Sequence, residues 1–118
     1  MRKYIEWNVG ENTYKLKLST QAIVEIERYY NNRSLLSLVG DQNTVTSFDF
    51  MCNLFYFSSK KYEKLKISDI YDLIDEYLEE EKTVEDLNDE VLMPLIESCG
   101  FFGKVEKKDS KKPTTPKK

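Results

Sequence analysis

The spacing of the apolar residues changes once along this chain of 118 residues, near position 18, and that change decides its fold class. In residues 3–18 apolar and polar residues alternate, as they do in a strand that buries one face. Ile5, Trp7 and Val9 share a face of the first run, and Gly10 in the following turn can adopt a positive φ. The pattern predicts a β-hairpin, which needs other elements to cover its apolar face because an isolated hairpin is marginally stable.

Beyond that point, apolar residues recur three and four positions apart, which is the period of a helix with one buried face. Four such segments follow, at about 20–31, 47–61, 68–82 and 84–99. Residues suited to N-capping lie at their starts: Ser19 or Thr20, Thr46 or Ser47, Ser68, and Thr83. Pro94 lacks a backbone N–H, so we expect it to kink or split the last helix.

The stretch between the first two helices predicts one helical turn at residues 34–41, closed by Gly40, and a loop at residues 41–44. Together the elements predict an α+β fold, mostly α, in which an N-terminal β-hairpin packs on a bundle of about four helices. The hairpin takes up residues 3–18, and we expect residues 1–103 to form a single globular domain.

Charge is distributed unevenly along the chain. Residues 104–118 hold seven Lys against Glu106 and Asp109, a net charge of +5, so the overall charge of −3 leaves −8 on residues 1–103. The Lys-rich segment contains one apolar residue, Val105, and is expected to be disordered because it cannot bury a core. The acidic remainder repels phosphate backbones, so we expect no specific nucleic-acid binding.

Several residue arrangements that commonly carry catalysis are missing from the sequence. Without His there is no Ser-His-Asp or Cys-His pair, and no imidazole ligand for a metal. Cys52 and Cys99 form no CxxC pair, and no glycine-rich phosphate loop occurs. We therefore predict no catalytic, cofactor-binding or metal-binding residues. No apolar run reaches the length of about 20 residues that spans a membrane, and two thiols in apolar surroundings suit a reducing cytoplasm.

Seven carboxylates lie within residues 69–82, DIYDLIDEYLEEEK. They fall between apolar residues at helical spacing, and they lack the glycine and ligand positions of a calcium loop. We interpret them as the solvated face of a helix. Glu79, Glu80 and Glu81 would end that helix at its negative pole, which is unfavourable, so their charge either keeps the protein soluble or steers a basic partner.

Three stretches give a resemblance to a known family: YKLKLSTQAIVEIE at 14–27, ISDIYDLIDEYLEEEKTVEDL at 67–87 and SCGFFGK at 98–104. With the order of the elements, they resemble the tail assembly chaperones of long-tailed phages and prophages of Gram-positive bacteria. The resemblance implies a protein that coats and solubilises the tape-measure protein and helps to recruit tail tube subunits. Such a protein acts in the host cell cytoplasm and is absent from the mature virion. A crowded coat also implies self-association, for which the edge of the hairpin is a candidate.

A chaperone for an apolar helix needs apolar side chains that its own core does not use. The candidates for binding that partner are Trp7, Phe48, Tyr56, Phe101 and Phe102. Trp7, on the hairpin, and Phe102, beyond the last helix, are preferred because both lie at edges of the expected domain. For each of the five, packing in the core is the competing interpretation.

Two other functions stay open at this point. An acidic adaptor or DNA mimic would present rows of carboxylates to a host protein that binds nucleic acid. A small enzyme would use carboxylates and Tyr side chains that converge in a pocket.

Overall fold

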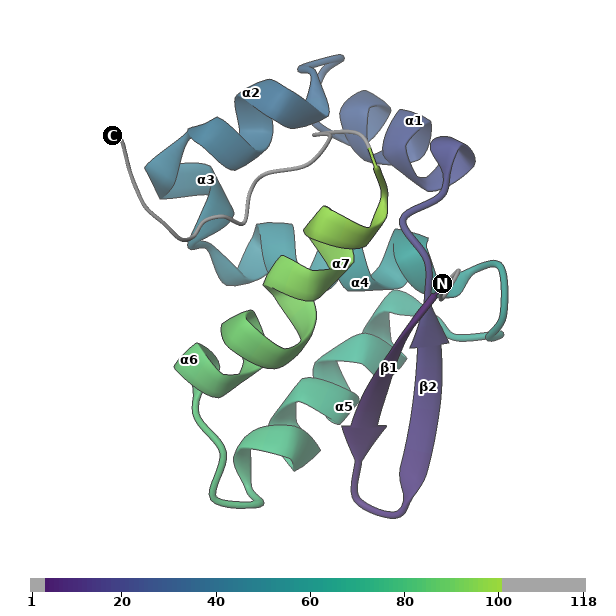
Figure 1. The fold of residues 1–118 in the computed structure, drawn as a ribbon, viewed down its shortest axis with the longest axis vertical. Coiled ribbons are helices and arrows are strands. Elements are labelled where there is room, and N and C mark those ends of the chain that lie inside the picture. The colour runs from purple at the N-terminus through teal and green to yellow at the C-terminus, as the bar shows by residue number, and fades with distance from the viewer. Residues whose placement is uncertain (1–3, 101–118) are drawn as a thin grey trace.

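The computed structural model describes residues 4–100, which begin with a hairpin and continue as helices (Figure 1). Strands β1 (Ile5–Val9) and β2 (Asn12–Leu16) pair antiparallel, with Trp7 opposite Tyr14. A turn of two residues joins them, and Gly10 at its first position has a φ of 60°. Glycine is the residue that a type II′ turn requires there, so the predicted hairpin is confirmed with its local cause.

The helices follow in the order α1 (Thr20–Tyr29), α2 (Leu35–Gly40), α3 (Gln42–Val45), α4 (Phe48–Ser59), α5 (Ile67–Leu78), α6 (Val84–Leu87), the π-helical turn η1 (Asn88–Leu92) and α7 (Met93–Ser98). The predicted fold class, α+β and mostly α with an N-terminal hairpin, is confirmed. The expected disordered segment at residues 104–118 lies outside the described residues.

Three of the predicted N-caps are confirmed. The side chains of Ser19, Ser47 and Thr83 each accept a hydrogen bond from the backbone N–H three residues later. The fourth prediction, Ser68, is wrong, because α5 begins earlier and its N-cap is Lys66. The backbone N–H of Lys66 donates to the Asp69 carboxylate at 2.8 Å, so a side chain inside the first turn stabilises this helix start.

The predicted end of α5 was too late by four residues. The helix ends at Leu78, and Glu81 has a φ of 65°, which a continuing helix does not allow. Residues 79–82 therefore form the turn into α6, and the acids expected inside the last helical turn lie just beyond it.

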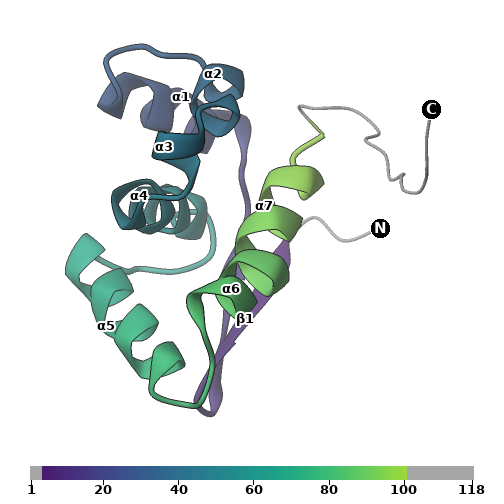
Figure 2. The ribbon, with the colours of Figure 1, turned by 90° about the vertical axis from the view of Figure 1, so that its left-hand side faces the viewer.

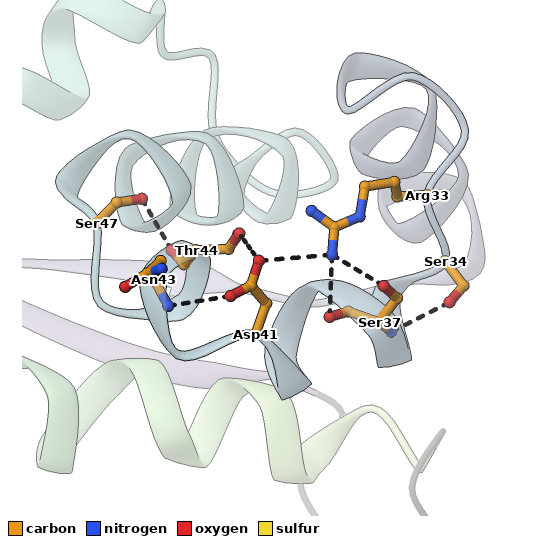
Figure 3. A network of polar contacts seen from close by, with 7 residues as sticks. All are labelled: Arg33, Ser34, Ser37, Asp41, Asn43, Thr44 and Ser47. Carbon is orange, nitrogen blue, oxygen red and sulfur yellow. Dashed lines mark hydrogen bonds and ion pairs between the residues drawn. The ribbon is translucent and has the colours of Figure 1, made fainter.

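The loop predicted at residues 41–44 is wrong, since most of it belongs to the short helix α3. Figure 3 shows the cause, which is the side chain of Asp41. Its carboxylate accepts hydrogen bonds from the Asn43 N–H at 3.1 Å and the Thr44 hydroxyl at 2.9 Å, and it lies 3.6 Å from the Arg33 guanidinium. Asp41 thus closes α2 through its backbone N–H, which donates to the Leu38 carbonyl at 3.3 Å, and starts α3 through its side chain.

The last predicted helix is interrupted, as the position of Pro94 indicated. The interruption is a π-helical turn in which the Met93 N–H bonds to the Asn88 carbonyl, five residues earlier. Pro94 then lies in the first turn of α7, where its missing N–H costs no hydrogen bond. The widened turn lets one continuous segment accommodate the proline.

The elements form two layers. Figure 2 shows α1, α4 and α5 on one side, and the hairpin with α6, η1 and α7 on the other. Trp7 joins the layers: its ring centroid lies 5.0 Å from that of Phe55 on α4 and 6.4 Å from that of Tyr77 on α5. The expectation that Trp7 lies at an edge of the domain is wrong, since its side chain is 0% exposed. A hairpin that is only marginally stable alone uses this large ring to attach itself to the helices.

The outer edge of β2 is occupied. The Lys17 N–H donates to the Ser58 carbonyl at 2.8 Å, and the Lys15 N–H donates to the Glu63 carboxylate at 2.9 Å. Self-association through the hairpin edge stays a prediction, and on the β2 side the N–H groups of Lys15 and Lys17 are not available for it because they already have partners.

Candidate functional site

Four aromatic rings form a connected surface across α1 and α4, which we call the aromatic surface: Tyr29, Tyr30, Tyr56 and Phe57. The ring centroids of Tyr29 and Phe57 lie 6.3 Å apart, and those of Tyr56 and Phe57 lie 5.1 Å apart. Tyr29 is 53% exposed, and the other three rings are half-buried. Because α1 and α4 pack side by side, rings from two helices join into one area that a partner can contact.

A lysine and a glutamate border this surface. The Lys60 ammonium lies 5.1 Å from the Tyr56 ring centroid and 5.2 Å from that of Phe57, and it pairs with the Glu25 carboxylate at 3.3 Å. The Gln21 amide donates to the same carboxylate at 3.1 Å. The Gln21 amide and the Lys60 ammonium lower the pKa of Glu25 from its ordinary value. The ammonium is thus held by a carboxylate and by two ring faces together.

A shallow pocket of about 140 Å³ opens between the start of α1 and the end of α4. Ala22 and Phe57 supply its apolar wall, while Gln21, Glu25 and Lys60 supply polar groups. Sites for whole small molecules usually measure about 300–1,000 Å³. The pocket therefore suits a single side chain of a partner better than a cofactor.

The orientation of Tyr30 is fixed by hydrogen bonds. Its hydroxyl donates to the Asp49 carboxylate at 2.7 Å, and the Asn53 amide donates to the backbone carbonyl of Asp49 at 2.8 Å. Burial and the neighbouring Asp49 raise the pKa of Tyr30, so the phenol stays protonated at neutral pH. The group holds a ring in place and does not supply a general base.

The candidate residues from the sequence are separated in the structure. Tyr56 belongs to the aromatic surface, and Phe48 is 49% exposed at the opposite end of α4. Trp7 belongs to the core, as described above. Phe101 and Phe102 lie outside the described residues.

Tyr29 is the functional candidate that sequence reasoning missed. The sequence pattern of the first helix, at about 20–31, singles out neither Tyr29 nor Tyr30 as a binding residue. Neighbouring residues of a helix point about 100° apart, so of two adjacent aromatics at the edge of an apolar stripe one is turned further toward the solvent. That signal was available in the sequence, although it does not say which other rings Tyr29 would meet.

Helix α5 has the buried apolar face and the solvated acidic face that the sequence predicts. Ile70, Leu73, Ile74 and Tyr77 of α5 are buried, while Asp72, Asp75 and Glu76 are exposed. Among residues 4–100, no three His, Cys, Asp or Glu side chains are grouped so that they could hold a metal ion. The pocket beside the aromatic surface contains a single carboxylate, that of Glu25.

No helix in the described part of the chain has both the length and the apolar character needed to cross a membrane.

A family model, described as a family of unknown function (DUF6096), matches residues 3–116. No curated protein and no solved structure matches the chain. The family is of unknown function, so the surfaces of the molecule are what indicates a function for this chain.

Proposed function

We propose that this chain, which belongs to the DUF6096 family of unknown function, is a non-catalytic tail assembly chaperone. It would bind and solubilise the tape-measure protein and help to recruit tail tube subunits in the host cell cytoplasm, without remaining in the mature virion. The resemblance of its sequence to such chaperones supports this function. The structural observation that carries the proposal is the exposed aromatic surface formed by α1 and α4.

The chemistry of this surface suits a long apolar helix. Aromatic side chains are enriched where proteins bind one another, because they offer a large apolar area at a low cost in conformational entropy. Tyr29, Tyr56 and Phe57 supply that area on two neighbouring helices, and the adjacent pocket accepts one projecting side chain. A bound helix would place apolar side chains at every third or fourth position along these rings.

The rest of the molecule supports a role in which many copies act together. Residues 1–103 carry a net charge of −8, as calculated above. Net charge of one sign keeps crowded proteins from precipitating. An aromatic binding surface on an acidic body can therefore hold an apolar partner in solution.

Co-expression with the tape-measure protein tests this function. We expect wild-type protein to keep the tape-measure protein in the soluble fraction, and the double variant Tyr29→Ala/Tyr56→Ala to lower that soluble amount about tenfold or more, as loss of central aromatic contacts does. Tyr71→Ala is the matched control, since Tyr71 on α5 is 52% exposed and Tyr29 is 53% exposed. The measurement is the amount of soluble tape-measure protein that co-purifies with each variant.

Two results would count against the proposal. If wild-type protein leaves the tape-measure protein insoluble, the function is wrong. If Tyr71→Ala lowers binding and the double variant does not, then α5 is the binding face. That second result would favour the alternative function, an acidic adaptor or DNA mimic, because α5 carries the exposed carboxylates.

A further inference from the structure

The lysines of the described residues gather at one end of the hairpin. Residues 4–100 contain nine Lys and Arg, and three of them, Arg28, Arg33 and Lys82, lie elsewhere. The other six form what we call the basic end: Lys15, Lys17, Lys60, Lys61, Lys64 and Lys66. Five of the six are exposed and Lys17 is half-buried. Four acids lie beside them: Glu25, Glu63, Glu6 opposite Lys15 in the hairpin, and Asp69, whose carboxylate accepts the Lys66 N–H. The local charge is therefore 6 − 4 = +2.

Tertiary contacts bring these lysines together from two distant segments. The Lys17 N–H bonds to the Ser58 carbonyl, and the Lys15 N–H bonds to Glu63, so the end of β2 lies against residues 58–63. The Lys15 ammonium also lies 5.8 Å from the ring centroid of Tyr62. Figure 1 shows the loop between α4 and α5 beside the end of β2. The contacts fix a cationic surface that no single stretch of sequence contains.

Carboxylates gather at the other end of the hairpin. The acidic end, as we call it, consists of Glu11, Glu76, Glu79, Glu80 and Glu81, all exposed. A Cβ placed on Gly10 would lie 2.6 Å from the Glu76 carboxylate and 3.4 Å from that of Glu80, so both side chains lie against the hairpin turn. The nearby Lys82 pairs with Glu90 at 3.3 Å. The acidic end therefore keeps a charge close to the sum of its five carboxylates.

The two ends are too far apart to neutralise each other within one molecule. Strand β2 (Asn12–Leu16) rises by roughly 3.4 Å per residue, which puts about 14 Å between its two ends. Charges separated by more than a Debye length of about 8 Å are largely screened at physiological salt. Contact with another molecule is needed to bring such charges close to an opposite partner.

We propose that the basic end of one copy docks onto the acidic end of a second copy, so that copies associate head to tail. The charges are complementary in sign, with a net +2 from six lysines against five carboxylates. Because the two docking surfaces are different and lie at opposite ends, each copy keeps one end free, and the association continues as a chain. A nucleic acid fits less well, since a long polyanion that reaches beyond the basic end meets a body of net −8. The proposal does not depend on the chaperone function.

Sedimentation of the purified full-length chain, without any tape-measure protein, tests the association. We expect assemblies larger than a dimer at about 0.02 M salt and monomers at about 0.5 M salt, because ion pairs at a surface are screened. The basic-end variant Lys15→Gln/Lys64→Gln/Lys66→Gln and the acidic-end variant Glu76→Gln/Glu79→Gln/Glu80→Gln should each raise the dissociation constant about tenfold. None of these residues belongs to the aromatic surface, so a failure here and a failure of the chaperone function are distinguishable.

Mixing the two variants gives the sharpest result. Each retains one intact end, so an equal mixture should recover the wild-type dissociation constant and stop at a dimer with one copy of each variant. Arg28→Gln/Arg33→Gln removes positive charge outside both ends and should assemble like wild type. The proposal is overturned if the wild-type chain is monomeric at low salt, if the mixture stays monomeric, or if the control variant also loses assembly. Binding of a DNA duplex that the basic-end variant loses, in a chain that does not self-associate, would identify nucleic acid as the partner instead.

Discussion

Trp7 is fully buried, yet its Nε1 atom has no hydrogen-bond partner among residues 4–100. An unpaired buried donor costs about 1–3 kcal/mol. The contacts of the indole with Phe55 and Tyr77 must outweigh that cost for the ring to remain inside. A residue that looks like a free binding group on a hairpin is therefore the side chain that attaches the hairpin to α4 and α5.

Replacing this ring tests its structural role. We expect Trp7→Ala to lower the free energy of unfolding by about 3–5 kcal/mol through the cavity it leaves. Trp7→Phe removes the unpaired donor together with part of the volume, so its loss should be clearly smaller. Urea unfolding followed by circular dichroism measures both, since the chain contains one Trp and its fluorescence disappears with the substitution. A loss below about 1 kcal/mol in Trp7→Ala would show that the indole does not hold the hairpin.

The sequence predicted local features well and contacts between distant residues poorly. The hairpin could be predicted from the alternation of apolar and polar residues and from Gly10 in its turn. The N-caps Ser19, Ser47 and Thr83 each accept a hydrogen bond from a backbone N–H only three residues away. All of these signals lie within a few residues of the feature they predict. The burial of Trp7 depends instead on Phe55, 48 positions along the chain, and no local pattern contains that contact.

The same reason explains what could be predicted of the functional surfaces. Tyr56 was a candidate because an aromatic residue on a helix is visible in the sequence. The aromatic surface itself needs α1 beside α4, which sets Tyr29 against Phe57. The basic end likewise needs β2 beside the loop after α4, which sets Lys15 near Tyr62. A sequence shows the residue types that a surface contains, whereas the packing of elements decides which of them meet.

At the scale of elements, Asp41 joins α2 to α3 through its charge. The Thr44 hydroxyl, the Asn43 N–H and the Arg33 guanidinium lower the pKa of this carboxyl below its ordinary value of 3.8. A carboxylate with a lowered pKa in the folded state stabilises that state above its ordinary pKa, and the contribution disappears as the pH falls through the folded value. The junction between the two helices should therefore weaken in acid.

Asp41→Asn should make this visible. We expect the variant to unfold at a lower temperature than wild type at pH 7, and the difference to shrink as the pH falls below the ordinary value of 3.8. Thermal unfolding followed by circular dichroism across that pH range measures the difference. Asp89→Asn, which changes an exposed carboxylate on η1, should show no such dependence. A difference between Asp41→Asn and wild type that is the same at every pH would show that the charge of Asp41 contributes nothing.

For the whole molecule, the acidic end is costly to the isolated chain. The carboxylates of Glu76 and Glu80 both lie against Gly10, so two like charges are held close together and repel each other. Glu79 and Glu80 also follow the negative end of the α5 dipole, which disfavours carboxylates. Removing some of these charges should therefore make the monomer more stable. Their presence is consistent with a use outside the monomer, such as the proposed contact with the basic end of another copy.

This conflict predicts opposite effects of one substitution on stability and on assembly. Glu79→Gln/Glu80→Gln should raise the free energy of unfolding of the monomer by about 0.5–1 kcal/mol at low salt, and the gain should vanish at about 0.5 M salt. The same variant should assemble less than wild type at low salt. Urea unfolding at concentrations where the chain is monomeric, together with sedimentation, measures the two effects separately. If the variant loses both stability and assembly, then the carboxylates support the fold of the monomer, and weaker assembly would only follow from a damaged surface.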